Sequence, residues 1–292
     1  MLLMENILQD LNDWLCEILI GVIRENCIVM FVDVNEKVGS IAEEVGKTPK
    51  SWNESIFSMI QTLSETVILP IAGMILTFVL CYELIHRITE TNSLHDFDGF
   101  LFFQWFLKAG IAVFVLSHTF DITAAVFDLG QHIVLQSGAV IGDTTNIDIG
   151  DAVLILDNTL DTMDIPELLL LGLETTVVSF AMKIITIIIT VILYGRMIEI
   201  YAYCSLAPIP MATLVNRDWG SIGQNYIRGL FALGLQGFLI MVCVAIYAVL
   251  VNGMILSDNI HTALLSVTAY TLLLCYTMLK SGGLAKSILH AG

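Results

Sequence analysis

Two lysines lie near the middle of apolar segments, where a charged side chain is costly. Lys108 lies within FLFFQWFLKAGIAVFVLSHTF and Lys183 within VVSFAMKIITIIITVILY. A lysine at the centre of a membrane helix costs about 2.5–3.5 kcal/mol on insertion scales, so such residues usually face other helices or water. Their chemistry is electrostatic, because an ammonium group can pair with a buried carboxylate or attract an anionic substrate.

Other polar side chains share a helical face with each lysine. Gln104 precedes Lys108 by four residues, which is about one helical turn. Around Lys183 the polar residues follow spacings that form one stripe on a helix: Thr176, Ser179, Lys183, Thr186 and Thr190. A polar stripe on an otherwise apolar helix faces neighbouring helices or an aqueous path.

Two interpretations of these polar faces stay open. The first is the lining of a path for an anionic substrate, in the interior of a helix bundle. The second is a set of contacts between helices, in which Lys108 reaches Glu83 and Lys183 reaches Glu174 or Glu199. Intramembrane hydrogen bonds contribute only about 0.6 kcal/mol on average, so such contacts offset the insertion cost poorly.

The composition indicates that these residues are carried by membrane helices. Of 292 residues, 57% are hydrophobic and 14% are charged, against about 45–50% and 25% in soluble domains. This excess predicts an integral membrane protein. The net charge of −16 argues against a general nucleic-acid-binding surface.

No pattern typical of an enzyme or a metal site occurs in the sequence. It contains no G-x-S-x-G, H-E-x-x-H or Walker motif, and no two of its cysteines lie closer than eleven residues. We therefore predict no catalytic residues, no metal and no cofactor.

The predicted fold is all-α and polytopic, because a span needs about 20 mostly apolar residues. Five segments meet this requirement: residues 57–85, 100–120, 168–194, 230–251 and 262–279. Before them, apolar residues between positions 8 and 22 recur at helical spacing and predict an amphipathic helix, and residues 36–52 read as a polar connector. The expected organisation is an N-terminal region, two spans, an acidic loop, three spans and a tail: residues 1–55, 56–120, 121–167, 168–280 and 281–292.

The segment IEIYAYCSLAPIPMATLV, residues 198–215, is apolar but contains Pro208 and Pro210. Each proline lacks a backbone N–H, and the freed carbonyls need partners at membrane depth. Because Arg196 and Arg217 flank the segment, we predict a re-entrant hairpin over residues 197–216 that bends near the prolines. A kinked sixth span is the alternative.

Basic residues near span ends favour the cytoplasm. Residues 121–167 contain no Lys or Arg and are expected outside, whereas Arg196, Arg217 and Lys280 are expected inside. The N-terminus is then outside and the C-terminus inside. Four basic residues of the N-terminal region conflict with this orientation: Arg24, Lys37, Lys47 and Lys50.

Residues 196–247 resemble the most recognisable region of the TrbL-like polytopic subunits of conjugative type IV secretion systems. The tail SGGLAKSILHAG resembles those of members from Gram-positive mobile elements. The residues that carry the resemblance, expected to be structural, are Arg196, Glu199, Pro208, Pro210, Gly223, Gln224, Asn225 and Gly229.

The resemblance implies a multi-pass channel or scaffold component in the bacterial cell membrane. Its expected partners are membrane lipids, other secretion subunits, further copies of itself in a homo-oligomer, and single-stranded DNA with its relaxase in transit. An oligomer with several copies of Lys108 and Lys183 could form a cationic passage for the phosphate backbone.

Three other functions remain as alternatives. A secondary transporter would use the broken segment around Pro208 as its substrate site, and should carry a matching interruption in its other half. Pro70 is a poor counterpart for that interruption. A membrane enzyme lacks a motif, and a pure scaffold would recruit soluble partners through the N-terminal helix and the acidic loop.

Overall fold

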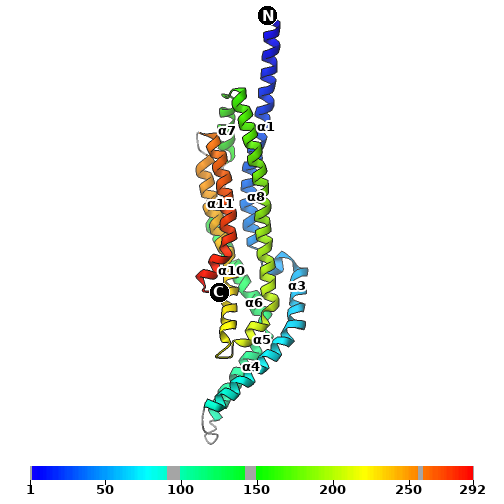
Figure 1. The fold of residues 1–292 in the computed structure, drawn as a ribbon, viewed down its shortest axis with the longest axis vertical. Coiled ribbons are helices and arrows are strands. Elements are labelled where there is room, and N and C mark those ends of the chain that lie inside the picture. The colour runs from blue at the N-terminus through cyan, green and yellow to red at the C-terminus, as the bar shows by residue number, and fades with distance from the viewer. Residues whose placement is uncertain (1, 91–98, 142–148, 256–258, 292) are drawn as a thin grey trace. The chain divides into compact units, whose positions relative to one another are not determined.

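The computed structural model describes residues 2–90, 99–141, 149–255 and 259–291, and these contain helices and no strand. The elements in chain order are α1 Leu2–Val45, α2 Pro49–Trp52, α3 Glu54–Leu63, the π-helical turn η1 Ser64–Ile68, α4 Leu69–Glu90, α5 Gly99–Ser117, α6 Thr119–Ile141, α7 Ile149–Leu160, α8 Ile165–Leu206, α9 Pro208–Thr213, α10 Gly220–Ile255 and α11 Ile260–Ile288 (Figure 1).

The prediction of an all-α polytopic membrane protein is confirmed. Four helical segments among the described residues are long and apolar enough to cross a membrane: Glu54–Thr89, Ile165–Leu206, Gly220–Met254 and Ile260–Ile288. A fifth candidate is the pair of α5 and α6, which is bent by 64° at its break. The predicted second span, residues 100–120, covers α5 and the first two residues of α6, so the helix ends at Ser117 and the chain bends there.

The acidic loop expected over residues 121–167 was wrong over residues 121–141, because these belong to α6. The later part of the range contains one short helix, α7. On α6, Asp121 and Asp128 are exposed, whereas Phe120 and Phe127 lie on a different face of the helix and are buried. A seven-residue apolar repeat buries one stripe of a helix whatever the charge of the other side.

The N-terminal region forms one helix through Val45, so the polar connector expected from residue 36 was wrong over most of its length. The predicted apolar face, which includes Leu11 and Ile18, is exposed. The buried stripe lies later in α1: Ile23, Cys27, Met30, Val34, Val38, Ile41 and Val45. Its spacing of three and four residues is that of a helix packed along one line.

The helix is interrupted at the prolines, as predicted. α8 ends at Leu206, and Pro208 begins α9, where a missing N–H costs no helical hydrogen bond. Residues 197–206, the first limb of the predicted hairpin, form the end of α8. With 42 residues, α8 is about 63 Å long, roughly twice the hydrocarbon core of a bilayer. Re-entry of residues 197–216 into a membrane stays a prediction.

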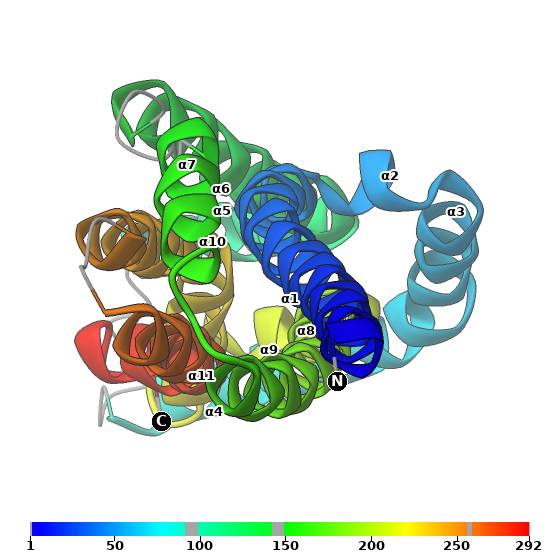
Figure 2. The ribbon, with the colours of Figure 1, turned by 90° about the horizontal axis from the view of Figure 1, so that it is seen from above.

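The chain forms two compact units. Unit 1 comprises Met1–Glu44, Gln136–Leu193 and Ile240–Leu279, and unit 2 comprises Val45–Leu135, Tyr194–Leu239 and Lys280–Gly292. In unit 1, α1 lies beside the first part of α8 and runs parallel to it (Figures 1 and 2). Ile23 lies against Gly172 there, and the Asn26 amide donates a hydrogen bond to Thr176 Oγ1 at 3.4 Å.

Unit 2 contains a small apolar cluster that holds α4, α5 and α9 together. Its buried members are Ala72 and Leu76 of α4, Ala112 and Leu116 of α5, and Ala212 of α9. Three of the five are alanines, which allow close approach of the helices. This packing positions the cavity described next.

Candidate functional site: two lysines on apolar helices

Lys108 of α5 forms an ion pair through Nζ with Glu83 Oε1 of α4. The second interpretation, a contact between helices, is thus confirmed for Lys108. Arg87, one turn beyond Glu83 on α4, lies 3.4 Å from the same carboxylate oxygen. The Glu83 carboxylate therefore lies between two cationic side chains.

Glu83 is 7% exposed, and its Oε2 atom has no hydrogen-bond partner among the described residues. Desolvation of a carboxylate is expensive, and nearby cations offset that cost only in part. Lys108 also lines the cavity described next, so an anion in that cavity would meet its ammonium group.

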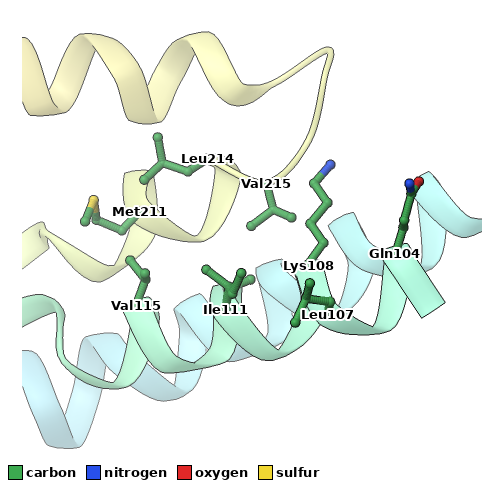
Figure 3. A pocket seen from close by; sticks show the side chains of 9 residues that line it. Gln104, Leu107, Lys108, Ile111, Val115, Met211, Leu214 and Val215 are labelled. Carbon is green, nitrogen blue, oxygen red and sulfur yellow. The ribbon is translucent and has the colours of Figure 1, made fainter. Parts of the chain in front are cut away.

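A cavity of about 370 Å³ lies between α5 and the α9 segment, and we name it the α5–α9 trough. Its α5 side is formed by Gln104, Leu107, Lys108, Ile111, Ala112 and Val115. Its other side is formed by Met211, Leu214 and Val215. Gln104 and Lys108 lie at one end, whereas the rest of the lining is apolar (Figure 3).

Lys183 differs from Lys108, because within the described ranges it makes no hydrogen bond and no ion pair. The partners expected for it were wrong. Glu174 pairs with His261 Nδ1, and Glu199 accepts a hydrogen bond from Lys286 Nζ at 2.9 Å. Lys183 is exposed on α8.

Lys183 lines an open cavity of about 590 Å³ between α8 and α1, which we name the α1–α8 groove. The lining residues are Asp33, Glu36, Lys37 and Ser40 of α1 and Lys183, Thr186 and Ile187 of α8. The α1 residues of this groove were not predicted from the sequence. The signal was present, since Asp33, Glu36, Lys37 and Ser40 follow the three- and four-residue spacing of one helical face.

Two other hydroxyl groups of the polar stripe on α8 donate hydrogen bonds to backbone carbonyls of the same helix. Thr176 Oγ1 donates to the Gly172 carbonyl at 2.7 Å, and Thr190 Oγ1 donates to the Thr186 carbonyl at 3.0 Å. Such bonds return a hydroxyl to the preceding turn and leave it less available to a substrate. Ser179 is half-buried between Thr176 and Lys183.

The residues that carried the family resemblance are mostly packed rather than reactive. Arg196 is 8% exposed, with its Nε unpaired among the described atoms. Gly223 lies so close to α9 that a Cβ there would be 2.7 Å from the Pro210 carbonyl oxygen. Gln224 and Asn225 are exposed, Gly229 lies against the Tyr203 ring, and Glu199 joins α8 to α11 through Lys286.

Comparison with known families adds one match. The family described as TrbL/VirB6 plasmid conjugal transfer like protein matches residues 34–208, which is more than half of the chain. The matched range contains both lysines, Arg196, Glu199 and Pro208, and it ends before Gly223. No curated protein and no solved structure matches this chain.

Proposed function

The chain belongs to the TrbL/VirB6 family of plasmid conjugal transfer proteins, and we propose that it forms part of the path that carries single-stranded DNA and its relaxase across the bacterial cell membrane. As a family member with several membrane-spanning helices, it is a component of a conjugal transfer system. Within that system we propose that the chain acts as a channel or scaffold and not as an enzyme. It would form a homo-oligomer that contacts other secretion subunits.

The observation that supports a path is the α1–α8 groove. Lys183 and Thr186 face it from an apolar helix, and Lys37 adds a second cation. Charged groups beside an apolar helix are placed toward protein or water because lipid does not solvate them. Several copies of the groove around one axis would offer a phosphate backbone a series of ammonium groups. Asp33 and Glu36 line the same groove and offset part of this charge, so the attraction depends on Lys183, which faces the groove from α8.

Lys108 supports the path less directly than Lys183. The Lys108 ammonium group forms an ion pair with Glu83, and the α5–α9 trough that it lines is mostly apolar. We therefore propose Lys183 as the main cation of the path and Gln104 and Lys108 as a separate feature.

A first test measures transfer frequency from a donor with an in-frame deletion, with and without the gene restored in trans. We expect transfer to vanish and to return on complementation. Unchanged transfer together with altered uptake of a solute would favour the secondary transporter.

A second test compares Lys183→Leu with Lys183→Arg in the complementing gene. We expect Lys183→Leu to lower transfer severalfold while the protein level in the membrane stays the same, because the groove loses a cation. Lys183→Arg keeps the charge and should restore transfer. The path proposal fails if Lys183→Leu assembles normally and transfers DNA as the wild type does.

A further inference from the structure

We propose that the α5–α9 trough binds one anionic phospholipid, with an acyl chain in the trough and the phosphate at Lys108. This inference goes beyond the transfer function, because it involves neither Lys183 nor DNA. It rests on the polarity, the charge and the aromatic surroundings of the trough.

The size and the lining of the trough suit an acyl chain. Its volume of about 370 Å³ falls within the range of small-molecule sites, about 300–1,000 Å³. Leu107 and Ile111 on its α5 wall are 54% and 56% exposed, so the trough opens along the helix. Around a helix of this apolar composition, the neighbouring medium is the hydrocarbon of the bilayer.

Apolar shape alone cannot select a lipid, since an acyl chain gains little by leaving other acyl chains. Selection must come from the polar end of the trough. There the Lys108 side chain is 35% exposed and its ammonium group pairs with Glu83, which Arg87 also approaches, and the Gln104 amide offers further N–H donors one turn away. Basic pockets between membrane helices bind anionic head groups in this way.

Aromatic side chains with polar tips lie at the same end of the trough. Trp105, in the turn before Lys108, donates through Nε1 to the Leu80 carbonyl at 3.3 Å. Trp219 stacks on Tyr82, the residue before Glu83, with ring centroids 5.7 Å apart. Trp and Tyr concentrate at the depth of the lipid head groups. From Gln104 and Lys108 the lining becomes apolar toward Val115 and Met211 (Figure 3). A phospholipid has the same order, with a polar head group followed by apolar acyl chains.

The test uses the full chain in nanodiscs made of equal parts phosphatidylglycerol and phosphatidylcholine. A trace of one or the other lipid carries a photoactivatable group on its acyl chain, and mass spectrometry maps the adducts. We expect the phosphatidylglycerol probe to label residues of α5 and of 211–215 severalfold more than the phosphatidylcholine probe.

Two pairs of variants separate the site from general lipid contact. Ile111→Trp fills the trough from an exposed position and should abolish the selective adducts, whereas Val113→Trp, exposed on the other side of α5, should not. Lys108→Gln should remove the preference for the anionic probe, and Lys108→Arg should keep it.

Three results would overturn the proposal. The first is equal labelling of the trough by both probes. The second is labelling that Ile111→Trp leaves unchanged. The third is an α5–α9 trough that yields no lipid adduct with either probe.

Discussion

At the scale of single residues, Glu83 shows how a membrane helix accommodates charge. Its side chain is nearly buried, and the cations of Lys108 and Arg87 approach the same oxygen atom. Two helices are thus joined by an ion pair whose acid has little contact with solvent. Removal of one partner from a buried pair leaves uncompensated charge, which is costly.

We expect Glu83→Gln to destabilise the protein by about 1–3 kcal/mol, because Lys108 and Arg87 then repel each other without an anion. Thermal unfolding in detergent measures this as a lower Tm. The matched control is Asp128→Asn, an exposed acid of α6, for which a change within about 0.5 kcal/mol is expected. Equal Tm values for the two variants would show that the pair contributes nothing.

At the scale of elements, α6 and α10 approach each other at two glycines. A Cβ added to Gly130 would lie 2.7 Å from the carbonyl oxygen of Gly234, a backbone atom that cannot rotate away. Close approach through small residues is the usual way in which membrane helices gain packing contacts. Within unit 2, Phe127 of α6 and Leu233 of α10 belong to the same buried apolar cluster.

Gly130→Ala should therefore destabilise the protein by about 1–3 kcal/mol through overpacking. Gly110→Ala, in the middle of α5 with nothing within 4 Å of its added Cβ, should be neutral or stabilise by up to about 1 kcal/mol, because alanine is the better helix former. Tm and resistance to trypsin in detergent report both. If Gly110→Ala destabilises as much as Gly130→Ala, the contact between α6 and α10 is not the cause.

At the scale of the whole molecule, the orientation in the membrane follows from the distribution of Lys and Arg. Residues 121–167 carry neither, whereas Arg217 and Arg228 lie on either side of the start of α10. We propose that residues 121–167 lie outside the cell and that Arg217 and Arg228 lie inside. Residues 197–216 would then return to the side from which they entered.

Cysteine labelling in intact cells tests this orientation in a chain whose six native cysteines are replaced. Asp161→Cys and Ser221→Cys both introduce a thiol at an exposed position. A membrane-impermeant maleimide should label Asp161→Cys in intact cells, and Ser221→Cys only after permeabilisation. Labelling of Ser221→Cys from outside would contradict the hairpin and support a kinked sixth span.

The sequence by itself determined the features that depend on local physics. Runs of apolar residues predict membrane helices because each backbone group must be satisfied within its own segment. The break at Pro208 follows from the missing N–H, and Glu83 was the only partner considered for Lys108. The acidic loop expected over residues 121–167 was wrong at α6, where Phe120, Phe127 and Val134 form a buried apolar stripe.

Only the tertiary structure decided which distant groups meet. Lys183 was expected to pair with Glu174 or Glu199, but His261 and Lys286 occupy those acids, and Lys183 instead faces Asp33 and Glu36 across the α1–α8 groove. The α5–α9 trough likewise joins segments about a hundred residues apart. The insertion cost of a lysine can be read from its own helix, whereas its partner depends on how the helices are arranged, which no local pattern encodes.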